Sequence, residues 1–466
     1  MPCPDATAGV GSGGVLTPFS FSYLTSRRVP STRHSCGFPQ IHPSACAGDV
    51  IADQIPTTRV AQLDGGLPLL LTSTADQHAV SIALSLGLGS RDDPQDLSGA
   101  AHLLERLVMS VPLQGGPSLS ARIEQLGGTS SAVTGPESLT IHAWVLTDDA
   151  PVVAGWMLDA LTQPALSNEA LDRERQVVAQ ELAVAAADPA DALQAAFLDA
   201  VFPGHPLGTA VGGTPSSVER ITLDPLLQVH QQALATVPLA LACVGNVQEA
   251  ALRKRMSPLA MARAGGVRPR RSPHAPIRRP NPQDPTWPDG FCRLLAGAPA
   301  PAVTDPRHYA FVLLGHLLGA SPASRMYRRL RDEHGLAYAF RARTRAYSDA
   351  GFWCFLAGAD GANGPAVVQL LHAELTRLAQ RGPAPADLEA AVRHARTELL
   401  RKAENGVESA VVMASDYCVN GVVRCPEAEA ARLAHVTAAD VAGAAAVVAD
   451  GLLVVVRPDG RARHEC

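Results

Sequence analysis

The chain has 466 residues, 47% of them hydrophobic and 18% charged, and a formal net charge of −5. That length is too great for a single hydrophobic core and suits two domains of about 200 residues each. Because the net charge is small and negative, the sequence offers no electrostatic basis for binding nucleic acid.

Cysteine usage and hydropathy indicate the cellular setting. The nine cysteines are irregularly spaced and include no C-x-x-C pair, which is typical of a reducing compartment rather than of a disulfide framework. No apolar run reaches the roughly 18 residues of a transmembrane helix, and the N-terminus lacks the charged and apolar regions of a signal peptide. We therefore expect a cytoplasmic protein without a membrane partner.

The first half alternates strand and helix patterns after a segment of low complexity. Residues 1–54 are rich in Gly, Ser, Pro, Thr and Cys, which predicts disorder. A first domain over 55–250 follows. Its hydrophobic patterns predict strands over 60–63, 67–72, 81–87 and 139–146, and helices over 98–110, 118–126, 151–161 and 169–187. Ser118 and Asn168 are the predicted N-caps of two of these helices.

Arginines and prolines concentrate in residues 251–290, where no acidic residue precedes Asp284. An electrostatic patch for an acidic partner is one interpretation, but we favour a solvated, proline-stiffened linker. The second domain, 291–460, repeats the first. Leu388-Glu389 and Glu398-Leu399 stand 217 positions after Leu171-Asp172 and Glu181-Leu182, which predicts a duplicated α+β unit.

The helix predicted over 98–110 carries the motif His102-x-x-Glu105-Arg106. In an H-x-x-E-H helix, the two imidazoles bind zinc and the carboxylate activates the metal-bound water. Arg106 stands in the place of the second histidine, and a guanidinium has no lone pair to offer a metal. Alone, the motif is short, and an amphipathic helix with a hydrogen-bonded histidine explains it more simply.

Neighbouring motifs make the pattern specific. Gly89-Ser90-Arg91-Asp92-Asp93-Pro94 precedes the helix, E-R-Q-V-V-A-Q-E runs from Glu174 to Glu181, and F-P-G-H-P-L-G begins at Phe202. In this order, over about residues 55–460, they resemble the pitrilysin/insulinase family of inverted-motif zinc metallopeptidases, which includes mitochondrial processing peptidase. The resemblance implies an α+β fold of two homologous domains, each an antiparallel sheet packed with helices, facing each other around a peptide chamber.

The resemblance also implies a degenerate zinc site. His102 and Glu181 match two of the family's metal ligands, and Glu181 stands 75 positions after Arg106. Glu105 matches the general base and Glu174 the auxiliary acidic residue, so both are interpreted as vestigial. Without a metal these carboxylates need another cation. We therefore expect Arg106 to pair with Glu105 or Glu181, with a bidentate pair to Glu181 as one option.

A second set of matching residues concerns the substrate. The segment from Arg331 to Tyr338 is similar to the family's R-E-x-x-G-L-A-Y, in which the Arg and Tyr hydrogen-bond the substrate near the scissile bond. Both side chains are strong donors for a carbonyl that gains negative charge. Ser131 stands where the family has an Asn that binds the substrate backbone, and its side chain is shorter. An exposed helix followed by a half-buried tyrosine is the plainer explanation of this segment.

Three functions are compatible with this pattern. The favoured one is a non-catalytic, Arg/Tyr-donating subunit of a heterodimeric pitrilysin-family zinc metallopeptidase that acts on peptides. Such a chain would be inactive alone and hold no cofactor, and its catalytic partner would carry the intact H-x-x-E-H and the zinc. The second is an active zinc metalloendopeptidase with an altered ligand set, although catalytic zinc normally keeps three protein ligands. The third is a scaffold, similar to core proteins of respiratory complexes, without a substrate role.

Several properties stay open at this stage. The sequence selects neither the peptide substrate nor the pathway. It also leaves open whether the assembly is a heterodimer or a homodimer, and whether residues 1–54 belong to the native protein.

Overall fold

The computed structural model describes residues 58–63, 65–256, 271, 285–319, 321–322, 324–337 and 339–459. The segment 1–54, most of the predicted linker and Tyr338 lie outside the described residues. Contacts among the described residues join the two halves into one compact unit. The α+β class is confirmed, and each half is built on its own sheet.

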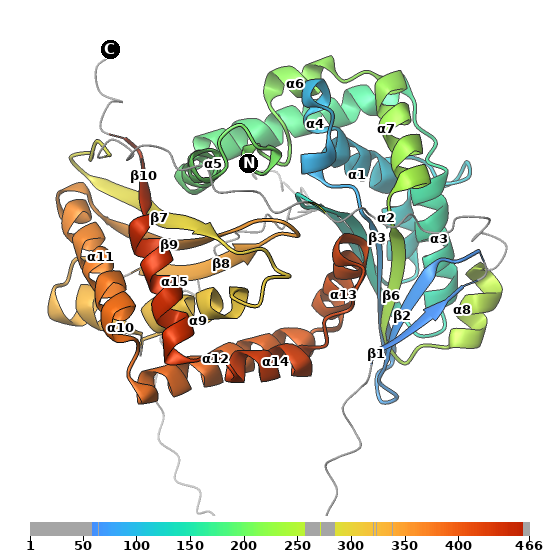
Figure 1. Cartoon of the computed structure of the whole chain (residues 1–466). Helices are drawn as coiled ribbons and strands as arrows, with labels where there is room; N and C mark the ends of the chain where they lie inside the picture. Colours follow the sequence, from blue (N-terminus) through green and yellow to red (C-terminus); the bar gives the residue numbers. More distant parts are fainter. Residues whose placement is uncertain are drawn as a thin grey trace, which may run out of the picture. The chain divides into compact units, whose positions relative to one another are not determined.

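The sheet of the first half has the strand order β1-β2-β6-β3-β5-β4 among the described residues, and Figure 1 labels the first four of these strands. Its strands are β1 (Thr58–Gln62), β2 (Pro68–Ser73), β3 (Ala79–Leu86), β4 (Thr129–Thr134), β5 (Leu139–Leu146) and β6 (Leu239–Gly245). Four of the five neighbouring pairs are antiparallel, whereas β2 and β6 run parallel. The sheet is therefore antiparallel as expected, except at the β2–β6 pair. The chain between β2 and β6 contains three strands and several helices, which is long enough for the crossover that parallel pairing requires.

Helices cover one face of this sheet with a core of leucine, valine and alanine. They are α1 (Ala100–Ser110), α2 (Leu119–Gln125), α3 (Ala150–Thr162), α4 (Asn168–Ala187), α6 (Pro215–Arg220), α7 (Leu223–Thr236) and α8 (Glu249–Met256). Short 3-10 turns precede α1 at η1 (Ser90–Asp92) and η2 (Gln95–Leu97). Helix α8 includes residues 251–256, which the sequence analysis assigned to the linker.

The helix caps test two of the sequence predictions. Ser118 caps α2, because its Oγ accepts from the Ala121 amide at 3.3 Å. The predicted cap of α4 was one residue late. Ser167 is the N-cap, with extended backbone and an Oγ that accepts from the Ala170 amide at 3.2 Å. Asn168 is already helical.

The sheet of the second half is antiparallel throughout, in the order β10-β7-β9-β8 among the described residues. Its strands are β7 (Phe291–Ala300), β8 (Ala339–Ala346), β9 (Gly351–Asp360) and β10 (Leu453–Arg457). The helices of this half are α9 (His308–Gly319), α10 (Arg325–Tyr327), α11 (Gly364–Arg381), α12 (Pro385–Ala403), α13 (Gly406–Asn420), α14 (Pro426–Ala434) and α15 (Ala438–Asp450). A π-helical turn, η4 (Arg328–Glu333), follows α10, and a 3-10 turn, η5 (Gly361–Asn363), precedes α11.

Each sheet is covered on its second face by a helix from the other half. Helix α5 (Pro189–Val201) belongs to the first half by sequence, but Phe197 packs with Phe352 and Leu295 of the second sheet. Helix α13 belongs to the second half, and Met413 packs against the first sheet. Strands β3 and β9 are buried along nearly their whole length, so both sheets need cover on both faces. This exchange places both halves in one structural unit.

The helices of the described part were also compared with the length and apolarity that a bilayer requires. No single helix meets both requirements, and the pair α14 and α15, bent by 92°, meets them only when the two are taken together.

Candidate functional site

Helix α1 carries the degenerate motif, and a half-buried carboxylate fixes its first turn. Asp93 Oδ2 accepts from the Gly99 amide at 2.8 Å, and Oδ1 accepts from the Ala101 amide at 2.9 Å. Gly99 has a φ of +98°, which favours glycine. Burial raises the pKa of Asp93 to about 7, although the backbone hydrogen bonds oppose the shift. The motif Asp92-Asp93-Pro94 therefore positions the helix, a role that the sequence analysis did not assign.

A glycine-rich loop holds the same helix end from the other side. Ser217 Oγ donates to the Ser98 carbonyl at 2.7 Å. A Cβ on Gly213 would lie 2.3 Å from the Ser98 carbonyl oxygen, and a Cβ on Gly99 would lie 2.7 Å from that of Gly212. The backbones therefore approach too closely for a side chain at either position, which explains the glycines at Gly99 and Gly213.

Five predicted site residues come together where α1 packs beside α4 (Figure 1). Arg106 Nη1 donates to Glu181 Oε1 at 2.7 Å, and Arg106 Nε donates to Glu174 Oε2 at 3.1 Å. The expected ion pair with Glu181 is present, but the guanidinium bridges two carboxylates of α4 instead of binding one bidentately. His102 Nε2 lies 3.2 Å from Glu181 Oε2, and His102 Nδ1 lies 3.3 Å from Glu105 Oε2.

The charges of this cluster are largely compensated within it. Burial disfavours the charged imidazole, but hydrogen bonds to Glu105 and Glu181 outweigh it and raise the pKa of His102 to about 9. The hydrogen bond from His102, together with Arg106, lowers the pKa of Glu181 despite partial burial. Glu105 is 8% exposed and also accepts from Thr134 Oγ1 at 2.8 Å. Thr134, on β4, is a member of the cluster that the sequence analysis missed.

The donor set of this cluster does not fit zinc. His102 and Glu181 are the two matching ligands, and catalytic zinc normally needs a third from the protein. The guanidinium of Arg106 already bonds the Glu181 carboxylate. A fixed positive charge in this position would also repel a metal cation. The site therefore holds an arginine where the motif would hold a second metal-binding histidine.

Arg331 lies on the π-helical turn η4 and is exposed. Its Nη1 donates to the Tyr327 hydroxyl, and its guanidinium carbon lies 5.0 Å from the centre of the Tyr327 ring. Among the described residues, Arg331 is thus paired with Tyr327 and not with the His102 cluster. Tyr338, the predicted second donor, lies outside the described residues.

A buried ion cluster anchors the turn that carries Arg331. Glu374 of α11 is 2% exposed and bonds Arg325 Nε at 2.9 Å, Arg329 Nη1 at 3.3 Å and Arg377 Nε at 2.9 Å. Burial would raise the pKa of Glu374, but the arginines lower it below its ordinary value. Sequence reasoning missed Glu374, because nothing in its local pattern distinguishes it from other helical glutamates.

Ser131 lies in the middle of β4, the last strand in the order of the first sheet. Its hydroxyl donates to the Ala132 carbonyl at 3.5 Å. Thr134 on the same strand contacts Glu105. The edge strand β4 therefore contacts the His102 cluster through Thr134.

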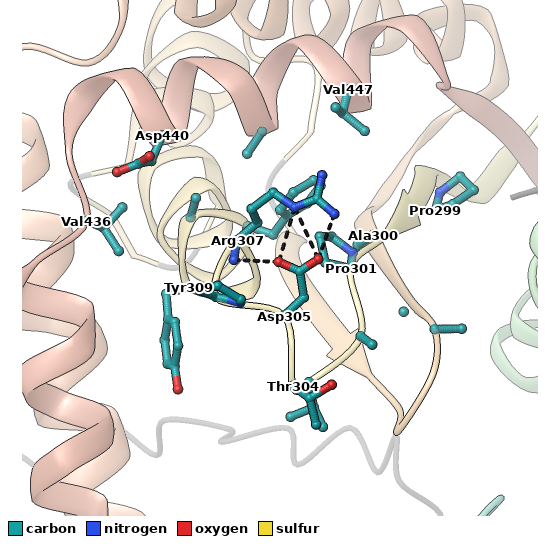
Figure 2. A pocket seen from close by; sticks show the side chains of 18 of the residues that line it. Pro299, Ala300, Pro301, Thr304, Asp305, Arg307, Tyr309, Val436, Asp440 and Val447 are labelled. Carbon is teal, nitrogen blue, oxygen red and sulfur yellow. Dashed lines mark hydrogen bonds and ion pairs between the residues drawn. The ribbon is translucent and has the colours of Figure 1, made fainter. Parts of the chain in front are cut away.

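A large cavity of about 1760 Å³ lies elsewhere, between the β7–α9 connection, α15 and the end of α5 (Figure 2). The Asp305–Arg307 ion pair, with Arg307 Nη2 2.6 Å from Asp305 Oδ2, sits on its wall. The wall also includes Tyr309 and Val447. None of the described residues predicted for the site lines this cavity.

Comparisons with known proteins show the family. Residues 69–215 match the profile of the insulinase family, peptidase family M16, and residues 220–394 match that of the peptidase M16 inactive domain. An uncharacterized zinc protease of Streptomyces coelicolor is 27% identical over 345 residues, covering 70% of this chain and 73% of its own length.

Solved structures share the fold. A protease from Helicobacter pylori superposes with a TM-score of 0.72 at 18% identity, covering 86% of this chain and 99% of its own. A peptidase M16 inactive domain from Pseudomonas fluorescens gives a TM-score of 0.73 at 17% identity, covering 86% and 97%. The chain belongs to the pitrilysin/insulinase family, peptidase family M16.

Proposed function

We propose that this chain is the non-catalytic subunit of a heterodimeric M16 zinc metalloendopeptidase, and that it donates Arg331 and Tyr338 to substrate bound mainly by its partner. The observation that carries the proposal is the arginine bridge in the first half. Arg106 bonds Glu174 and Glu181, so the carboxylates that would serve a metal already have a cation.

Arg331 and Tyr338 provide the chemistry of this role. A guanidinium and a phenol donate strong hydrogen bonds to a carbonyl oxygen that becomes negative as the peptide bond is attacked. Arg331 is exposed on a turn anchored by Glu374, which leaves its guanidinium accessible to a ligand. To reach a substrate, Arg331 would exchange its contact with Tyr327 for one with the carbonyl.

The edge strand β4 supports a peptide as the ligand. In the described part of the chain, β4 pairs with β5 on one side and ends the strand order on the other. An extended peptide can add to such an edge through main-chain hydrogen bonds. Ser131 lies on this strand, so peptide binding at β4 would place the substrate beside the residue that replaces the family's asparagine.

The partner in this proposal is an M16 chain with an intact H-x-x-E-H motif. It would supply the zinc, the activated water and most of the binding surface. The test is peptide turnover by complexes reconstituted from the partner and variants of this chain. Arg331→Ala or Tyr338→Phe should lower turnover by about 100-fold or more, the usual loss for one oxyanion donor, while the complex still assembles.

Glu105→Gln in this chain is the matched control and should leave turnover nearly unchanged. If Glu105→Gln abolished activity and Tyr338→Phe did not, this chain would be the catalyst and the second function would hold. If none of the three variants changed turnover while assembly persisted, the scaffold function would replace the proposal. Cleavage by this chain alone would also overturn it.

A further inference from the structure

A second cluster of metal-binding side chains lies in the second half, away from the His102 cluster. His316 of α9 faces His394 and Glu398 of α12. One ligand atom from each residue lies within 4.8 Å of the other two, in the part of the chain that the structure describes. We propose that His316, His394 and Glu398 form a binding site for a divalent transition-metal cation, for which zinc is the best-suited ion.

The donor types and their spacing carry this proposal. Two imidazoles and one carboxylate are a ligand set that zinc accepts, with a fourth position left for water. His394 and Glu398 are four residues apart and share one face of α12. His316 reaches them from α9, which packs against α12. His394 is exposed, so a cation can enter from solvent.

The two imidazoles already point ring nitrogens at each other. His316 Nδ1 and His394 Nδ1 lie 2.9 Å apart. Two such nitrogens need either a proton or a cation between them, because neither lone pair can face the other without cost. Tetrahedral zinc with Zn–N bonds of 2.0–2.1 Å would hold them roughly 3.4 Å apart. A small rotation of the exposed His394 ring provides the difference.

The two carboxylate oxygens of Glu398 face different side chains. Its Oε2 lies 3.8 Å from His316 Nε2. Its Oε1 lies 3.6 Å from Arg341 Nη2 and 3.7 Å from Lys402 Nζ, which is longer than a hydrogen bond. The side chains of Arg341 and Lys402 are 64% and 47% exposed, so both cations can turn toward water when a metal arrives.

The position of this cluster repeats that of the first-half site. Helix α12 begins 217 positions after α4, and Glu398 stands 217 positions after Glu181. Helix α9 packs beside α12 as α1 packs beside α4. His316 faces Glu398 as His102 faces Glu181. The second half thus combines three metal-binding donors at the place where, in the first half, Arg106 is bonded to Glu181. The sequence predicts that this chain holds no cofactor, and the metal site proposed for the second half departs from that prediction.

The test is zinc titration of the tag-free full-length chain after chelator treatment, with competition against a chromophoric chelator. The wild type and His102→Ala should bind the same number of zinc ions. His394→Ala and Glu398→Gln should each bind one fewer, or bind it weaker by about 10–100-fold or more. Cobalt(II) should give the absorption of a tetrahedral site in the wild type, and that absorption should be absent in His394→Ala.

Two controls separate the outcomes. His435→Ala removes a histidine that is exposed and lies outside the cluster, and it should bind zinc as the wild type does. Far-UV circular dichroism of each variant without metal checks the fold, and Glu398→Gln keeps the volume of the side chain if His394→Ala unfolds. Equal zinc binding by wild type, His394→Ala and Glu398→Gln would overturn the proposal. Loss of zinc in His102→Ala alone would overturn it too and would favour the active-peptidase function instead.

Discussion

Arg106 is the residue at which this chain departs from the H-x-x-E-H motif. It is bonded to Glu174 and Glu181, and its side chain is 25% exposed. One planar guanidinium satisfies two carboxylates that would otherwise repel each other, a task for which its fixed fork of donors is suited. The arginine in the place of the second histidine therefore supplies a positive charge to both carboxylates.

We predict that Arg106→Met destabilises the chain. Without the guanidinium, Glu174 and Glu181 lose their shared cation in a partly buried site, which should lower the free energy of unfolding by about 1–3 kcal/mol. Urea denaturation is the measurement. Arg173→Met is the control, because Arg173 pairs with Glu169 on the exposed face of α4 and surface pairs contribute about 0–1 kcal/mol. Equal losses in both variants would contradict the bridging role.

Arg106→His should restore a zinc site in the first half. The variant would combine His102, Glu181 and the introduced imidazole, the three ligands that a catalytic zinc site needs, on helices already held by Asp93 and the glycine loop. We expect Arg106→His in a His394→Ala background to bind one more zinc per chain than the His394→Ala parent, in which the second-half cluster does not contribute. No additional zinc would mean that the geometry of α1 and α4 has also departed from that of a metal site.

At the scale of elements, helices α5 and α13 stabilise the contact between the two halves. Each covers the sheet of the opposite half, through Phe197 on one side and Met413 on the other. Phe197 is 1% exposed and its ring meets Phe352 edge to face at 5.5 Å. Because each core is completed by a helix of the other half, neither sheet is covered on both faces by its own half.

We predict that Phe197→Ala lowers the stability of both halves together, by about 3–5 kcal/mol. The measurement is denaturant unfolding of chains that retain Trp156 or Trp353 as the single tryptophan, one reporting on each half. Both probes should shift by the same amount in a single transition. Phe291→Ala is the matched control, because Phe291 is 56% exposed, and it should cost far less. A shift seen only by Trp353 would show that the halves unfold independently.

At the scale of the whole molecule, buried ion pairs connect the halves. Arg91 of the first half bonds Asp349 of the second bidentately, at 2.7 and 2.8 Å, and both side chains are 5% exposed. Glu137 accepts from the Ser348 amide at 3.0 Å. Burial would raise the pKa of Asp349, but Arg91 lowers it below its ordinary value. The arginine of the G-S-R motif is therefore a structural connection between the two halves.

The contribution of His308 to the stability of the chain should fall in mild acid. Burial, together with the nearby Arg424, lowers the pKa of His308 from 6.5 to about 4. Between pH 6.5 and 4 the unfolded chain therefore binds more protons at this residue than the folded chain, and the free energy of unfolding falls as pH falls. Thermal unfolding in this window should depend less steeply on pH for His308→Gln than for the wild type. The exposed His78→Gln should keep the wild-type slope, and equal slopes for all three proteins would exclude His308 as the cause.

The sequence by itself determined the family, the α+β class and the pairing of α1 with α4. The family resemblance, carried by short motifs, placed His102, Glu105 and Glu181 at one site, and side-chain charge predicted that Arg106 pairs with Glu105 or Glu181. Helix boundaries were predicted to within about two residues because hydrophobic periodicity and capping are also local.

Only the tertiary structure decided which partners share a site across long sequence separations. The bridge from Arg106 to Glu174, the contact of Thr134 with Glu105 and the cluster of arginines around Glu374 depend on how helices and strands pack. The packing of α5 and α13 on the sheet of the opposite half also depends on the tertiary structure, and so does the parallel pairing of β2 with β6. Each of these residues or segments is ordinary in its local pattern. His316 and His394 are 78 positions apart in the chain, and folding alone brings them together beside Glu398.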